Sequence, residues 1–210
     1  MIDTAVVSFA TFFATISPID ISAIFAALTV GATAQHRRAM AIRATLIATV
    51  ILVLFAVAGK MLLASIGISL AALRTAGGIL LLLIAIELVF ARSSGGTSAT
   101  DEEKLEAASK QDISVFPLAT PLIAGPGAMG AAILLMANAE GELLRQATVI
   151  ASLFAVLLIT AVALLLAGKI HRLLGVTGMH VITRVMGILL SALAVQFVFD
   201  GIRQSGVLGN

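Results

Sequence analysis

The sequence contains no cysteine, no tryptophan and no tyrosine, and charged residues fill only 11% of its 210 positions. The absence of cysteine excludes disulfides, iron–sulfur clusters and thiolate metal sites. A soluble domain carries about 25% charged residues, so a chain that is 60% hydrophobic could not cover its core in water. The net charge of +2 is spread without a basic face for phosphates. These absences exclude a cytosolic enzyme, a disordered chain and a nucleic-acid binder.

Long apolar runs dominate what is present. A helix that crosses the hydrocarbon core of a bilayer needs roughly 20 mostly apolar residues. Six segments meet this requirement, so we expect an all-α membrane protein that crosses the bilayer six times. The predicted spans cover residues 4–30, 41–59, 70–91, 113–137, 147–167 and 181–202.

A polar segment separates the third and fourth predicted spans. It is rich in Ser, Gly, Thr and charged residues, which is typical of a solvated linker. The expected domains are a first three-helix repeat at 1–92, a polar cytoplasmic linker at 93–112 and a second three-helix repeat at 113–210.

The distribution of Lys and Arg predicts the orientation of the chain. With the N-terminus outside, inner loops hold more of these residues than outer loops, which the positive-inside rule requires. We therefore expect a multi-pass protein of the bacterial inner membrane with both termini periplasmic. The inner residues are Arg37, Arg38, Arg43, Arg92, Lys104, Lys110, Lys169, Arg172 and Arg184, and the outer residues are Lys60, Arg74, Arg145 and Arg203.

The two halves of the chain resemble each other in order and in spacing. Because each half holds three spans, an odd number, the second half enters the membrane from the opposite side. The sequence thus predicts two inverted three-helix repeats, an arrangement found in secondary transporters. The matching segments, 108 or 109 residues apart, are Ser17-Pro18 with Gly125-Pro126, Ala58-Gly59-Lys60 with Ala167-Gly168-Lys169, and Gly78-Ile79-Leu80-Leu81 with Gly187-Ile188-Leu189-Leu190.

Proline and glycine interrupt the first and fourth predicted spans, at 17–20 and at 117–127. Proline has no amide donor, and in a bilayer the freed carbonyls need other partners or a hydrated cavity. Interruptions at corresponding positions of two halves indicate a transport site, although packing kinks would produce the same pattern. Half-helix N-termini suit a carboxylate and exposed carbonyls suit an ammonium group, so a zwitterionic amino acid fits both. The predicted substrate-binding residues are Ser17, Pro18, Asp20, Thr120, Pro121, Gly125, Pro126 and Gly127.

Three charged residues are candidates for coupling or gating. Asp20 lies inside the first span, where a carboxylate costs roughly 2.5–3.5 kcal/mol on insertion scales, so it is expected to face a polar interior. We hypothesise that Asp20 binds the substrate ammonium group or carries a coupling proton; the alternative is a position near the inner end. Arg74 and Arg184 lie near the starts of the third and sixth spans. They are candidate gating residues; the alternative is that they are anchors whose charge reaches the membrane surface.

These motifs resemble those of the MarC family, also called the neutral amino acid transporter family. The run Pro117-Leu118-Ala119-Thr120-Pro121-Leu122-Ile123-Ala124-Gly125-Pro126-Gly127 is similar to the fourth-span motif of the family. Ser17-Pro18-Ile19-Asp20 is similar to its Asn-Pro-Ile-Gly-like first motif, with Ser17 and Asp20 as departures. The resemblance covers nearly the whole chain. It implies six spans and transport of small neutral amino acids such as glycine or alanine.

The sequence therefore predicts a secondary transporter of a small neutral amino acid that works by alternating access. Its partners are the lipid bilayer and the amino acid, a proton or sodium gradient is its driving force, and it needs no cofactor. A homo-oligomer is compatible with the sequence. The alternatives are a channel or a transporter of another small solute, and a non-transporting scaffold or regulatory protein. Neither ligand-spaced His, Asp and Glu nor a nucleophile–base pair occurs, so we expect neither a metal site nor an enzyme.

Overall fold

The fold is known from a computed structural model, which describes residues 2–29, 32–65, 67–90, 112–139 and 141–206. Every regular element within these ranges is a helix, as the absence of strand-type alternation in the sequence requires. The predicted linker at 93–112 lies outside the described residues, apart from Asp112.

Two of the spans are built from two helices each. The first span consists of α1 (Ile2–Ile16) and α2 (Pro18–Leu28), and the fourth consists of η1 (Ser114–Ile123) and α6 (Pro126–Asn138). Among the described residues, five helical stretches are long and apolar enough to cross a membrane, and the bent pair η1–α6 makes a sixth, in agreement with the predicted number. The other four helices are α3 (Ala34–Ser65), α4 (Leu70–Phe90), α7 (Leu143–Leu165) and α8 (Ala167–Gln204).

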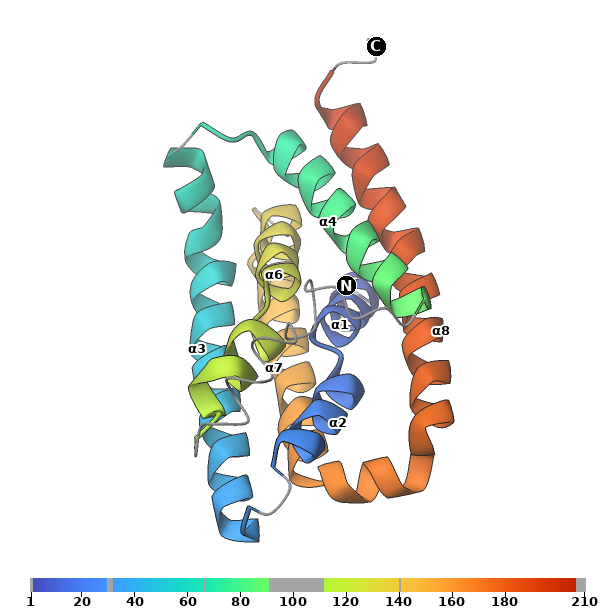
Figure 1. The fold of residues 1–210 in the computed structure, drawn as a ribbon. Helices are drawn as coiled ribbons and strands as arrows, with labels where there is room; N and C mark the ends of the chain where they lie inside the picture. Colours follow the sequence, from blue (N-terminus) through green and yellow to red (C-terminus); the bar gives the residue numbers. More distant parts are fainter. Residues whose placement is uncertain (1, 30–31, 66, 91–111, 140, 207–210) are drawn as a thin grey trace.

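Two helices are longer than the predicted spans. α3 begins at Ala34 rather than at residue 41, because the polar residues before the apolar run include the good helix formers Ala, Arg and Gln. α8 starts directly after Leu166 and bends before it turns into the bundle, so the predicted span at 181–202 is only its C-terminal part (Figure 1). A hydropathy window finds the apolar part of a helix and cannot find where its polar extension ends.

The bundle has two ends, each named here after the two helices that its connection joins. At the α2–α3 end, α2 and α7 finish while α3 and α8 begin; this is the lower end in Figure 1. At the α3–α4 end, α3, α6 and α8 finish while α4 and α7 begin (Figure 1). Successive spans therefore alternate in direction.

Helices of the first half pack on the second half in matching pairs. α2 contacts α7 and α8, whereas α6 contacts α3 and α4. In the same way α1 contacts α7, and η1 contacts α3. If each helix is replaced by its counterpart in the other half, the contacts of α2 become those of α6, and the contact of α1 with α7 becomes that of η1 with α3. The most extensive contact of all joins α4 to α8, the third helix of each half.

Two glycines bring α4 and α8 close together. A Cβ atom on Gly78 would lie 2.8 Å from the Ala194 carbonyl oxygen and 2.8 Å from the Val198 amide nitrogen. A Cβ atom on Gly187 would lie 2.9 Å from the amide nitrogen of Val89. Small residues at such crossings allow membrane helices to pack backbone against backbone. Gly78 thus faces Val198, which lies 11 positions after Gly187. In the same way Gly187 faces Val89, which lies 11 positions after Gly78.

The surface between the two ends is apolar, as a lipid-facing surface must be. Large hydrophobic side chains are more than half exposed there, among them Leu54 (58%), Val50 (69%) and Leu158 (67%). Water would make this much exposed apolar area a strong aggregation surface, whereas hydrocarbon tails solvate it.

Candidate functional site

The first break occurs at one residue, Ser17. Its backbone lies in the left-handed region (φ 50°, ψ 64°), and Pro18 follows as the first residue of α2. Because Pro18 has no N–H, the Ala14 carbonyl loses its normal helical partner; the Ser17 hydroxyl replaces it and donates to that oxygen at 2.6 Å. The first N–H groups of α2 have no acceptor within the helix, as at any helix start. The span therefore contains a helix N-terminus within the membrane.

The left-handed backbone of Ser17 predicts the order in which variants at this position melt. Glycine and asparagine adopt the left-handed region most readily, whereas a β-branched residue there is a true outlier. We expect Ser17→Gly and Ser17→Asn to melt close to the wild type, and Ser17→Val to melt at least about 5 °C lower. Ser17→Ala is the control, because it removes the same hydroxyl without β-branching. Equal melting temperatures for the Ala and Val variants would contradict the left-handed conformation.

The second break is spread over ten residues in η1. Phe116 and Thr120 have extended backbones (φ −131°, ψ 128° and φ −132°, ψ 129°), and each precedes a proline. Proline disfavours the α conformation in the residue before it, which explains both departures. The two peptide bonds to Pro117 and Pro121 are cis.

Hydrogen bonds of the π type hold η1 together around these prolines. The Leu118 amide donates to the Ile113 carbonyl at 3.1 Å, and the Ala124 amide donates to the Ala119 carbonyl at 2.8 Å. η1 and α6 meet at an angle of 53°, so this span is sharply bent. The prediction of an interruption in the fourth span is confirmed, and the run of prolines is its cause.

The start of α6 repeats the start of α2. Gly125 is the residue before the helix, with an extended backbone, and Pro126 is the first helical residue. Gly127 lies against α4: a Cβ atom there would come within 2.2 Å of the end of the Ile84 side chain. Both interrupted spans therefore continue as a helix whose first residue is proline.

The two breaks lie beside each other in the bundle. α1 contacts α6 while α2 contacts η1, so the halves of the two spans pair crosswise around the breaks. Of the predicted binding residues, Pro18, Gly125 and Gly127 are buried, and Ser17, Asp20, Thr120 and Pro121 are half-buried, whereas Pro126 is exposed. Asp20 is in the first turn of α2, where a carboxylate interacts favourably with the helix dipole.

A buried stripe of hydroxyl groups follows the first span, and none of its members is among the predicted site residues. The stripe consists of Ser8, Thr11, Thr15, Ser22 and Thr29, each no more than 4% exposed. Ser8, Thr11 and Thr15, spaced by 3 and 4, share one face of α1, a signal that the sequence contained, whereas Ser22 lies on α2 beyond the break and Thr29 at its C-terminal end. Four of the hydroxyls donate to carbonyls one turn earlier, for example Thr15 to Thr11 at 2.8 Å. The lone pairs of the hydroxyls on α1 make one face of that helix polar.

A cavity of about 220 Å³ lies at the α3–α4 end, where α1, α6, α7 and α8 meet. Its polar lining includes Asp3, Asn138 and Arg145 together with Ser8, the first member of the hydroxyl stripe. The buried Ser8 hydroxyl has no hydrogen-bond partner among the described residues. The Arg145 guanidinium also pairs with Glu142 at 2.8 Å. The cavity thus presents charges of both signs next to a hydroxyl with free bonding capacity.

The two candidate gating arginines occupy different surroundings. The Arg74 guanidinium is half-buried and donates to the side-chain oxygen of Asn138 and, at 2.7 Å, to that of Gln204. It thereby ties α4 to the last turns of α6 and α8. The side chain of Arg184 is exposed on α8. Only Arg74 therefore lies at a junction of several helices.

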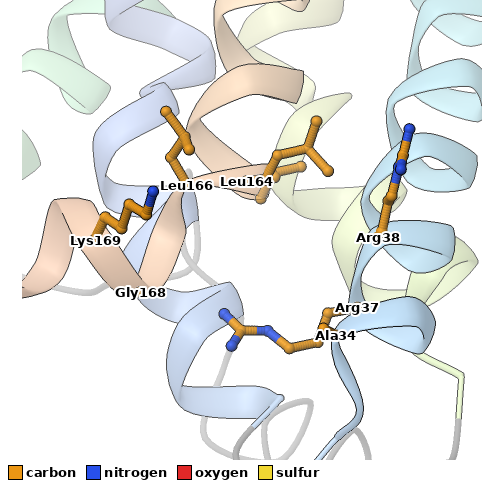
Figure 2. A pocket seen from close by; sticks show the side chains of 8 residues that line it. Ala34, Arg37, Arg38, Leu164, Leu166, Gly168 and Lys169 are labelled. Carbon is orange, nitrogen blue, oxygen red and sulfur yellow. The ribbon is translucent and has the colours of Figure 1, made fainter.

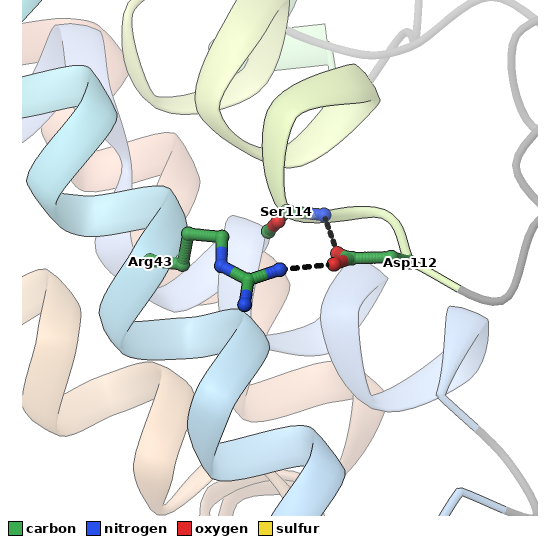
Figure 3. Close-up of polar contacts among 3 residues, drawn as sticks. All are labelled: Arg43, Asp112 and Ser114. Carbon is green, nitrogen blue, oxygen red and sulfur yellow. Dashed lines mark hydrogen bonds and ion pairs between the residues drawn. The ribbon is translucent and has the colours of Figure 1, made fainter.

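An ion pair joins the second half to α3 at the α2–α3 end. The Arg43 guanidinium donates to one carboxylate oxygen of Asp112, and the Ser114 amide donates to the other at 2.9 Å (Figure 3). Hydrogen bonds from Ser114 lower the pKa of the Asp112 carboxyl, and the charge of Arg43 lowers it further. Asp112 is therefore ionised at neutral pH and anchors the start of η1 to α3.

Six apolar spans, two of them interrupted side by side, define a polytopic helical membrane protein. The model of the MarC family, described as MarC family integral membrane protein, matches residues 2–205. The chain therefore belongs to the MarC family.

Relatives with similarity over nearly their whole length occur in archaea and bacteria. The UPF0056 membrane protein of Archaeoglobus fulgidus is 37% identical over 197 residues, which cover 94% of this chain and 91% of the relative. The UPF0056 membrane protein YvbG of Bacillus subtilis is 37% identical and covers 93% and 92%. YhcE of Escherichia coli is 33% identical and covers 91% and 88%. No solved structure gives a significant match.

Proposed function

We propose that this protein is a secondary transporter that carries a small neutral amino acid across the bacterial inner membrane by alternating access. The observation that supports it most strongly is the side-by-side position of the two breaks, where α2 and α6 each begin with a proline inside the membrane. Interrupted helices in corresponding positions of two halves are the usual construction of a transporter binding site.

The chemistry at the breaks suits a zwitterion. The helix N-termini at Pro18 and Pro126 offer backbone N–H groups and a positive dipole end to a carboxylate. Asp20, two residues into α2, offers the opposite charge to an ammonium group. Gly125, the residue before α6, has no side chain, which would let a small substrate such as glycine or alanine approach the backbone there. We assign substrate binding to this region.

Inverted repeats supply the motion in this proposal. The paired contacts of α2 and α6, and the reciprocal approach of Gly78 and Gly187, are what a two-fold axis in the membrane plane would produce. Two halves related in this way can exchange conformations, which converts an inward-open state into an outward-open one. A proton or sodium gradient would drive the exchange.

The access path in this proposal starts at the cavity near Asp3 and Arg145. These two side chains carry the charges that would attract both groups of a zwitterion. From Ser8 the hydroxyl stripe leads along α1 to Thr15, two residues before the break at Ser17. A polar face of this kind lowers the cost of moving a charged molecule through an apolar bundle.

Counterflow in proteoliposomes tests the proposal. Vesicles loaded with unlabelled alanine are diluted into labelled alanine without an ion gradient. We expect transient, saturable accumulation of label that external glycine inhibits and external lysine does not. A channel would equilibrate the label without overshoot, and a non-transporting scaffold would match empty liposomes; either outcome would refute the proposal.

We also propose that the α2–α3 end faces the cytoplasm and that both termini are periplasmic. Because the chain has no cysteine, single cysteines report accessibility without background. A membrane-impermeant maleimide added to intact spheroplasts should label Ser205→Cys and leave Gln35→Cys unlabelled until the membrane is permeabilised. Both positions are exposed and lie at opposite ends of the bundle. The reverse labelling pattern would show the opposite orientation.

A further inference from the structure

A second cavity, here called the basic pocket, lies at the α2–α3 end and has no role in the proposed transport path. It has a volume of about 380 Å³ and opens between the start of α3, the end of α7 and the start of α8. Three of its eight lining residues are cationic and none is acidic. The lining residues are Ala34, Arg37, Arg38, Leu164, Leu165, Leu166, Gly168 and Lys169.

The cations surround the pocket from different helices. Lys169 of α8 and Leu166 lie on one wall, Arg38 of α3 lies on the opposite wall, and Arg37 extends across the floor between them (Figure 2). The start of α3 at this pocket adds a positive dipole end to the three side-chain charges, whereas the end of α7 and the start of α8 meet there with opposite dipole ends. An anion in the pocket would be held from several directions.

Arg37 is held in place by its neighbours. Its guanidinium carbon lies 5.8 Å from the centre of the Phe25 ring of α2, a cation–π distance. A Cβ atom on Gly168 would lie 3.9 Å from a terminal nitrogen of Arg37, so the guanidinium lies against the start of α8. The pocket is therefore part of the helix packing and not a chance gathering of surface lysines.

The depth of the pocket matches the head-group layer of a bilayer. One membrane span begins at Ala34 and another ends at Leu165, and both residues line the pocket. Leu165 and Leu166 beside it are 47% and 41% exposed. On α3, Ile42 follows Arg38 by one turn and is 42% exposed, so an apolar surface begins where the cations end. The arrangement places a charged group beside hydrocarbon.

We propose that the basic pocket binds the phosphate group of an anionic phospholipid, with the acyl chains along the exposed apolar residues of α3 and α7. Arginine pairs with phosphate through two parallel hydrogen bonds, and lysine adds a point charge. Basic pockets between membrane helices on the cytoplasmic side are typical of such lipid sites. Free inorganic phosphate shares the charge but would leave the apolar part of the site unused.

Thermal stability of the delipidated protein in detergent tests this proposal. Phosphatidylglycerol, phosphatidylcholine and inorganic phosphate are titrated separately, because a ligand that binds only the folded state raises the melting temperature. We expect phosphatidylglycerol alone to stabilise the wild type. Each lost cation should raise the half-effective lipid concentration about fivefold, so Arg38→Gln/Lys169→Gln should require about 25-fold more lipid.

The matched control is Lys60→Gln/Arg203→Gln, which removes two cations at the opposite end of the bundle. It should respond to phosphatidylglycerol as the wild type does. If the double variant does not fold, Lys169→Gln alone alters one exposed side chain and should show the fivefold change. Equal stabilisation by inorganic phosphate, an equal response to phosphatidylcholine, or an equal loss in the control would each overturn the proposal.

Discussion

Gly78→Ala and Gly187→Ala are expected to lower the melting temperature of the purified protein by similar amounts. In each case the new methyl group would lie under 3 Å from backbone of the facing helix, 2.8 Å for Gly78 and 2.9 Å for Gly187. Backbone cannot rotate away as a side chain can, so α4 and α8 must separate. Overpacking of this kind costs typically 1–3 kcal/mol, which corresponds to a decrease of about 2–12 °C for a chain of this length.

Gly130→Ala is the matched control for both variants. Gly130 is also helical, but a Cβ atom there would have no atom within 4 Å. Alanine favours a helix over glycine by about 1 kcal/mol, so this variant should melt at or above the wild-type temperature. Thermal melts in the same detergent compare the three. If Gly187→Ala behaved like Gly130→Ala while Gly78→Ala was destabilised, the reciprocal packing of the two halves would be contradicted.

The sequence was sufficient to predict the spans and their interruptions. Apolar runs of the required length mark all six spans. A proline in the interior of a helix removes a hydrogen bond and kinks or breaks the helix, so Pro18 and Pro121 indicated interrupted spans without tertiary information. The ends of the helices were harder to predict. The polar first turn of α3 and the bent start of α8 are helical because of local propensity and packing, and hydropathy does not report either.

Details of the site depended on packing that local patterns do not encode. That Arg74 joins α6 and α8 while Arg184 is exposed follows from which helix faces inward, since both residues begin an apolar run in the same way. The left-handed backbone at Ser17 was also not predicted. It gives a physical reason for asparagine in the similar family motif, because asparagine adopts this conformation more readily than serine. The hydroxyl stripe, in contrast, could have been found from its helical spacing.

Asp20→Asn should abolish or strongly reduce alanine transport, and this is the largest functional effect that we expect. If the carboxylate binds the substrate ammonium group, its loss removes a charge-assisted hydrogen bond worth about 1.5–3 kcal/mol, a decrease of roughly 10- to 150-fold in affinity. Counterflow at low substrate concentration measures this effect. If Asp20 carries a coupling proton instead, the variant should retain counterflow and lose accumulation driven by a pH gradient.

A purely structural role of Asp20 makes a third, distinct prediction. Asp20 is in the first turn of α2, where its charge stabilises the helix by about 0.3–1 kcal/mol, so Asp20→Asn would lower the melting temperature slightly without altering transport per folded molecule. Asp200→Asn is the control, since it neutralises a carboxylate near the end of α8, where Asp200 accepts a hydrogen bond from Gln196 at 3.0 Å. Normal counterflow and normal gradient-driven uptake in Asp20→Asn would exclude both transport roles. Equal transport losses in the two variants would show that the effect is not specific to the break.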